Sequence, residues 1–189
     1  MIFALLLLLL MFVGLIIQHF IGPIPTLGAR VLIMQIIMLY GALALPLPGM
    51  LVLTFAGGLM WDALHTQWIG ESVAEGQVEI AMGWSIVLYS ALGTIMSGFR
   101  PLFLRGRWEI HCLLTGFCTS LMVLAEYLMI TVRRQPILFQ FDQQVWWKIG
   151  GAGLIATLLA PLFFFLLNYL ALLIGYDPQP ERATRKTKR

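Results

Sequence analysis

Charged side chains are scarce in this sequence of 189 residues. Asp, Glu, Lys and Arg together make up 11% of it, and hydrophobic residues make up 60%. Soluble globular domains carry about 25% charged residues. Long stretches contain no charge at all, and a helix needs about 20 predominantly apolar residues to cross a bilayer. The composition therefore predicts an all-α, polytopic membrane protein with no room for a separate soluble domain.

Motifs of known enzymes and of metal sites are also missing. The sequence contains no H-E-x-x-H, no G-x-S-x-G, no glycine-rich phosphate loop and no C-x-x-C. The only cysteines, Cys112 and Cys118, fall on different faces of one predicted helix. None of the three histidines is followed by a second metal ligand three or four residues later; they are His19, His65 and His111. We therefore expect a protein that is not an enzyme and that holds no cofactor or metal.

Six segments are apolar enough to be membrane-spanning helices: 2–21, 31–47, 49–64, 81–99, 110–132 and 149–175. The run Pro46-Leu47-Pro48-Gly49 predicts a turn between the second and third segments, because proline and glycine end helices. The six segments fill residues 1–176, which we predict to be one transmembrane domain. Residues 177–189 form a basic tail.

The distribution of Lys and Arg predicts the orientation. Six spans place both termini on one side, and basic residues favour the cytoplasm. With the termini inside, eight basic residues are cytoplasmic and four are external. The acidic segment 65–80 then lies outside. The net charge of +3 is too small and scattered to suggest a nucleic-acid partner, whereas the basic tail suits anionic lipid head groups.

Two carboxylates interrupt the apolar segments. A buried charge inside a membrane is costly, by roughly 3 kcal/mol on insertion scales, so Asp62 and Glu126 need a reason to be there. Three interpretations of Asp62 remain open: a solvent-exposed acid at a helix end, a buried hydrogen-bond partner, or a group that binds a proton or a ligand. Glu126 continues a stripe of polar and small side chains, which favours helix packing over a conduction path; the stripe is Cys112, Thr115, Thr119 and Met122.

Small residues predict close helix packing at three places. Gly57 and Gly58 precede Asp62 in the third segment. The fourth segment carries a stripe of Gly83, Ser90, Gly93, Thr94 and Ser97. Gly150, Gly151 and Gly153 open the sixth segment. The lone polar residues Gln35 and Asn168 are expected to make hydrogen bonds between helices.

The third and fourth segments resemble the MreD family of rod shape-determining proteins. That family shows a glycine-rich helix ending in Gly-Leu-x-x-Asp, matched here by Gly58-Leu59-Met60-Trp61-Asp62. A further helix with small residues and then a basic stretch follow in the family, as Trp84–Gly93 and Arg100 do here. The chain departs from the family pattern in the longer acidic loop 65–82 and in the basic tail.

The resemblance implies a six-helix transmembrane bundle similar to the S components of energy-coupling-factor transporters. It implies a non-catalytic scaffold of the bacterial cell-elongation machinery, in the inner membrane. The implied partners are an MreC-like protein, an MreB-like actin, a RodA-type glycosyltransferase and a penicillin-binding transpeptidase. On this reading the important residues serve helix packing; they are Gly57, Gly58, Asp62, Ser90, Gly93, Ser97 and Glu126.

Two other functions remain open. A vitamin-binding S component would use an outward pocket, which the two carboxylates suit. It would also dock through small residues of its first helix, where this chain has only Ala4 and Gly14. A proton-coupled carrier could use both carboxylates, but the sequence shows none of the repeats or interrupted helices typical of such carriers.

Overall fold

The computed structural model describes residues 2–22, 24, 28–65, 83–104, 108–133 and 143–176. Within these residues every regular element is a helix, which confirms the all-α prediction. The helices are α1 (Ile2–Phe20), α2 (Ile33–Ala44), α3 (Leu47–His65), α4 (Trp84–Gly98), α5 (Arg100–Leu104), α6 (Trp108–Arg133) and α7 (Gln143–Leu173). The basic tail and the acidic segment, apart from His65, lie outside the described residues.

Four of these helices, α1, α3, α6 and α7, are long and apolar enough to cross a membrane. The predicted spans 31–47 and 81–99 are shorter than expected. Helix α2 has 12 residues and α4 has 15, which corresponds to roughly 18 Å and 22 Å against a hydrocarbon core of about 30 Å. Gly28 and Gly83, with φ of 61° and 99°, hold the chain in a left-handed conformation before each helix. The described residues therefore contain four apolar helices long enough to cross a membrane and two shorter apolar helices, which indicates a membrane protein.

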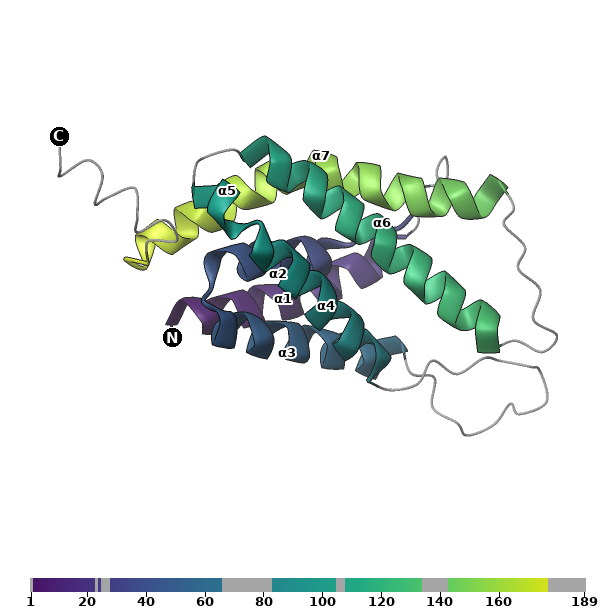
Figure 1. Cartoon of the computed structure of the whole chain (residues 1–189), viewed down its shortest axis with the longest axis horizontal. Coiled ribbons are helices and arrows are strands. Elements are labelled where there is room, and N and C mark those ends of the chain that lie inside the picture. Colours follow the sequence, from purple (N-terminus) through teal and green to yellow (C-terminus); the bar gives the residue numbers. More distant parts are fainter. Residues whose placement is uncertain are drawn as a thin grey trace.

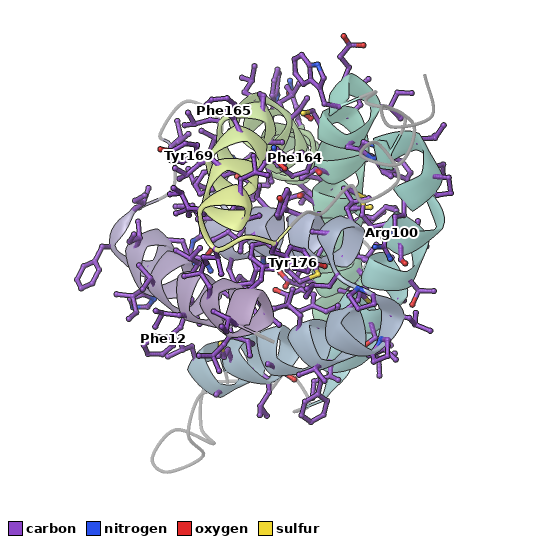
Figure 2. The ribbon with its side chains drawn as sticks, turned by 90° about the vertical axis from the view of Figure 1, so that its left-hand side faces the viewer. Phe12, Arg100, Phe164, Phe165, Tyr169 and Tyr176 are labelled. Carbon is purple, nitrogen blue, oxygen red and sulfur yellow. The ribbon has the colours of Figure 1, made fainter. Side chains whose placement is uncertain are left out.

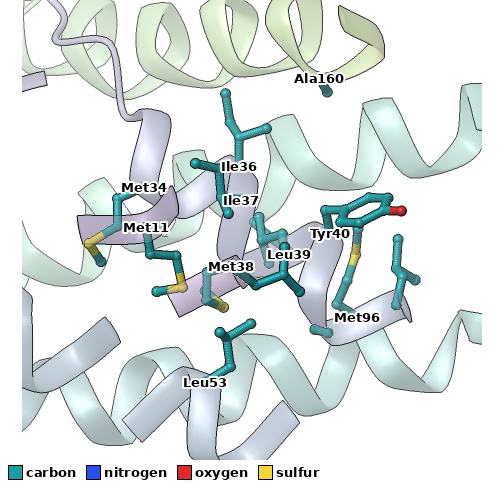
Figure 3. Packing of buried hydrophobic residues seen from close by; sticks show 14 of the residues in the cluster. Met11, Met34, Ile36, Ile37, Met38, Leu39, Tyr40, Leu53, Met96 and Ala160 are labelled. Atoms are coloured by element: carbon teal, nitrogen blue, oxygen red, sulfur yellow. The ribbon is translucent and has the colours of Figure 1, made fainter. Parts of the chain in front are cut away.

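Helix α2 is the centre of the bundle. All 12 of its residues are buried, and α1, α3, α4, α6 and α7 all pack against it. Figure 2 looks along the bundle and shows Phe164 and Tyr176 turned inward while Phe12, Phe165 and Tyr169 point away from it. Figure 3 shows the interior around α2, where Met11, Met34 and Met38 fill the space between neighbouring helices. A helix that is apolar on every side needs this buried position.

The outer surface of the other long helices is apolar. Leu5 of α1, Leu158 and Phe165 of α7 and Leu113 of α6 are all more than half exposed. Such large apolar faces are unfavourable in water but suit lipid chains. The surface therefore agrees with the composition in indicating a membrane protein.

The first and last helices meet at one end of the bundle, called here the terminal end (Figure 1). The rings of Phe3 and Tyr176 stack with centroids 4.6 Å apart. The Tyr176 hydroxyl donates a hydrogen bond to the carbonyl oxygen of Ala44 at 2.8 Å. The start of α1 and the ends of α2 and α7 therefore lie together. The opposite end, where α3 ends and α4 begins, is called the distal end.

The largest further differences from the sequence prediction are two helix starts and one short helix. Helix α3 begins at Leu47, so Pro48 and Gly49 lie in its first turn and only Leu45 and Pro46 connect it to α2. The prediction of a turn over 46–49 was wrong because proline fits the first turn of a helix, where its missing N–H costs nothing. Helix α7 begins at Gln143 and not at 149, and the short α5 was not predicted.

Candidate functional site

The glycine pair of α3 lies against α4. A Cβ on Gly58 would lie 2.5 Å from the Cα and 2.6 Å from the N of Ile86, so the obstacle is the backbone of α4 itself. A Cβ on Gly57 would lie 2.5 Å from the terminal Cε of Met11, which is the flexible end of a side chain. A side chain at position 58 is therefore excluded by the closeness of the α3 and α4 backbones. At position 57 it is opposed only by a side chain that can move.

The contact between α3 and α4 continues toward the terminal end, and we call it the α3–α4 seam. A Cβ on Gly93 would lie 2.7 Å from Cγ2 of Thr54, and Ser90 Oγ lies 3.4 Å from Thr54 Oγ1. Ser97 is only partly buried. Thr94 is exposed and donates its hydroxyl to the Ser90 carbonyl of its own helix at 2.7 Å. Only part of the predicted stripe thus faces α3.

Asp62 closes the distal end of this seam. It is only 3% exposed, which does not fit the wet, interfacial alternative. Its Oδ2 accepts a hydrogen bond from the backbone N–H of Gly83 at 2.6 Å. Gly83 is the N-cap residue of α4, where the helix dipole favours a negative charge. Asp62 therefore joins the end of α3 to the start of α4.

Glu126 of α6 lies in the same region of the fold as Asp62. The Trp61 indole N–H donates a hydrogen bond to the Glu126 carboxyl group, and Asp62 lies near enough for its charge to act on Glu126. Glu126 is partly buried, but its Oε1 is fully buried and has no hydrogen-bond partner. The fold thus places the two carboxylates, which are far apart in the sequence, within electrostatic range of each other.

Gln35 and Tyr89 lie in the same region. Together with Trp61, Asp62 and Glu126 they form what we call the distal polar cluster. Gln35 of α2 is 1% exposed, and its Nε2 donates to the Tyr89 hydroxyl of α4 at 2.9 Å. This bond confirms the prediction that Gln35 bridges helices. Both carboxylates act on Tyr89, so all five residues share one region. Sequence reasoning missed Tyr89, although a hydroxyl in an otherwise apolar segment is a usable signal.

A second close contact joins α6 to α7, and we call it the α6–α7 seam. A Cβ on Gly116 would lie 2.6 Å from the carbonyl oxygen of Gly153, and one on Gly153 would lie 2.8 Å from that of Gly116. The same added atoms would also collide with the Thr157 and Ser120 hydroxyls. Gly150, by contrast, has open space around it. Sequence reasoning found Gly153 but missed Gly116, which stands alone in its helix.

The predicted polar stripe of α6 faces the interior, but its hydroxyls bond within their own helix. Thr115 donates to the His111 carbonyl at 2.7 Å and Thr119 to the Thr115 carbonyl at 2.8 Å. Both threonines are buried. The two threonine hydroxyls therefore bond within α6, whereas Glu126 at the distal end of the stripe accepts a hydrogen bond from Trp61 of α3.

Comparison with protein-family models, with curated proteins and with solved structures finds no significant match to this chain.

Proposed function

We propose that this protein is a non-catalytic scaffold of a bacterial cell-elongation machinery of the MreD type. Its role is to hold an MreC-like protein, an MreB-like actin, a RodA-type glycosyltransferase and a penicillin-binding transpeptidase together at the membrane. The proposal rests on the resemblance of residues 50–100 to that family. It is supported by the contacts that the matching residues make between α3 and α4.

One observation carries most of the weight: the segment that bears the resemblance serves helix packing. Gly58 lies against the backbone of Ile86, and Asp62 accepts the Gly83 N–H. A scaffold needs a surface of fixed shape, and interlocked helices provide one. An acid bound to a backbone N–H is suited to fixing a helix end.

The proposed location is the bacterial cytoplasmic membrane with both termini in the cytoplasm. The contact of Phe3 with Tyr176 supports termini on a common side. A cytoplasm-dependent reporter fused after Arg189 is expected to be active. Activity of a periplasm-dependent reporter at that site would reverse the orientation.

The functional test is depletion of the protein in its own bacterium. Rod-shaped cells are expected to become round, and the MreC-like protein is expected to co-purify with the tagged chain from detergent extracts. An unrelated multi-pass protein, tagged in the same way and present at the same membrane abundance, is the control. Normal cell shape together with no enrichment of the MreC-like protein would contradict the proposal.

The distal polar cluster favours one other function, that of a vitamin-binding S component. The arrangement of α1 counts against it. Gly14 is buried, and a Cβ there would lie 3.1 Å from side-chain atoms of both Ile33 and Ile37, so it is not available as a docking face. Uptake of a labelled vitamin that disappears on depletion, with cell shape unchanged, would favour this alternative.

A further inference from the structure

Asn168 carries an amide into the apolar part of α7 and reaches the outer surface of that helix. It is only partly buried, and its side chain has no hydrogen-bond partner among the described residues. The sequence predicts that Asn168 bonds to another helix, so the fold of a single chain leaves this prediction unmet within the part described. Residues 169–174 are all apolar or aromatic, which keeps the amide inside the hydrocarbon region, where no water satisfies it.

The surface of α7 around Asn168 follows a regular repeat. Steps of four and three residues alternate along what we call the α7 outer stripe, which consists of Leu154, Leu158, Pro161, Phe165, Asn168 and Leu172. A repeat of 3.5 residues is the pattern of two helices that pack against each other along their length. The four large apolar side chains of the stripe are all more than half exposed, and Phe165 points away from the bundle (Figure 2). No described helix of the chain therefore covers the stripe.

A second copy of this chain has the chemistry that the stripe requires. Copies of one sequence insert into the membrane in the same orientation, so two α7 helices that meet are parallel. A parallel, two-fold symmetric pair brings equal positions to the same depth, and each Asn168 then faces the other. An amide has both donors and an acceptor, so two amides satisfy each other. A single Asn in an otherwise apolar seam also fixes the register of two helices.

We propose that this protein forms a parallel, two-fold symmetric dimer in the membrane through the α7 outer stripe, with hydrogen bonds between the two Asn168 side chains. Lipid chains are as apolar as leucine, so close packing and the amide bonds hold the two helices together. The stripe contains no residue of the α3–α4 seam or of the distal polar cluster. The dimer is thus independent of the proposed scaffold function, and either one can fail without the other.

Disulfide cross-linking locates the interface. The full-length protein is oxidised in its native membranes as wild type, Phe165→Cys, Leu172→Cys and the control Leu166→Cys. Leu166 is exposed on the same helix but is turned by about 100° from Phe165. The natural Cys112 and Cys118 are buried, so the wild type gives the background.

Phe165→Cys and Leu172→Cys are expected to form a disulfide-linked product of twice the mass of the chain, because equal positions lie side by side in a parallel pair. The wild type and Leu166→Cys are expected to remain single chains. An equal yield from Leu166→Cys overturns the stripe as the interface. Absence of the double-mass product from both stripe variants, or its replacement by a link to a different protein, overturns the dimer.

Energy transfer between differently labelled copies in phosphatidylcholine vesicles tests the role of Asn168. Asn168→Leu keeps the size of the side chain and removes the amide, so it is expected to weaken association roughly 3- to 30-fold. Asn168→Gln keeps an amide and is expected to retain most of the association. A wild type that stays monomeric as the lipid is made scarcer overturns the dimer, and unchanged association of Asn168→Leu overturns the amide contact.

Thermal unfolding separates this role from a structural one. Asn168 has no bond to the described part of its own chain, so Asn168→Leu is expected to melt at the wild-type temperature when the protein is diluted to monomers in detergent. A lower melting temperature of the diluted variant would place the partner of Asn168 within its own chain and overturn the proposal.

Discussion

The α3–α4 and α6–α7 seams both bring helices close at glycines, but they do so differently. In the α6–α7 seam each glycine faces the carbonyl of the other, with Ser120 and Thr157 alongside. In the α3–α4 seam one glycine, Gly58, faces the backbone of Ile86, and a carboxylate closes the distal end. The first contact is reciprocal and is crossed by one hydroxyl bond, from Ser120 to the Ile149 carbonyl, whereas the second is one-sided and ends in a carboxylate.

The difference has a consequence for stability and for function. Both backbones of the α6–α7 seam must move if either glycine gains a side chain, so that seam should tolerate the least change. The α3–α4 seam has a movable side chain beside one of its glycines, Gly57. It also borders the distal polar cluster, so it is the seam where packing and charge act together.

The largest loss of stability is expected from Gly116→Ala and Gly153→Ala. Each added methyl group meets a carbonyl oxygen and a hydroxyl, and overpacking of this kind costs about 1–3 kcal/mol. Thermal unfolding of the detergent-solubilised protein measures the loss. The double variant should cost less than the sum of the single ones, because both changes separate the same two helices. Additive losses would show that the two glycines do not share one contact.

The next effect distinguishes the two glycines of α3. Gly58→Ala should destabilise the protein by about 1–3 kcal/mol, since the backbone of Ile86 cannot move aside alone. Gly57→Ala should cost less, because the Met11 thioether can take another rotamer. The comparison uses the same melting measurement. Equal losses would mean that the obstacle at Gly58 yields as easily as a side chain.

Smaller effects are expected from the polar contacts of the two seams. Asp62→Asn keeps an oxygen that can accept the Gly83 N–H but loses the charge, at a cost of about 1 kcal/mol. Ser120→Ala loses the hydroxyl that donates to the Ile149 carbonyl at 3.2 Å, at a similar cost of about 0.5–1.5 kcal/mol. Denaturation midpoints measure both. A loss for either variant that exceeds that of Gly116→Ala would contradict the view that close backbone packing dominates.

The smallest change, and one of opposite sign, is expected at Gly150. This glycine is exposed inside α7 with open space around it. Alanine there should stabilise the helix by about 0.5–1 kcal/mol, because glycine is the poorer helix former. A loss of stability at Gly150 would mean that α7 has a close neighbour on that side.

How much the sequence could predict depended on whether a signal was local. The contiguous run from Gly57 to Asp62 predicted a close packing site, and the apolar segments predicted the positions of the long helices. Gly116 could not be found, because a lone glycine acquires meaning only from Gly153 on the facing helix. The shortness of α2 was also hidden, since residues 31 and 32 are as apolar as the helix that follows and hydropathy does not register the left-handed turn at Gly28.

The nearness of Asp62 to Glu126 illustrates the same limit. The two acids belong to different predicted spans, and only the packing of α3 and α6 around α2 brings the Trp61 indole to Glu126. Burial of Asp62 likewise depends on the Gly83 N–H at the start of α4. Neither contact leaves a trace in local sequence patterns.

The central claim is that the segment from Gly57 to Asp62 supports a scaffold through helix packing. The most direct test compares Gly57→Leu, Gly58→Leu and Asp62→Asn with the control Gly150→Leu, at matched membrane abundance, for cell shape and for co-purification of the MreC-like partner. We expect Gly58→Leu to reduce both most strongly, Gly57→Leu less so, Asp62→Asn weakly, and Gly150→Leu not at all. Loss of both in Asp62→Asn, with the Gly57 and Gly58 variants unaffected, would contradict the packing account and give Asp62 a chemical role.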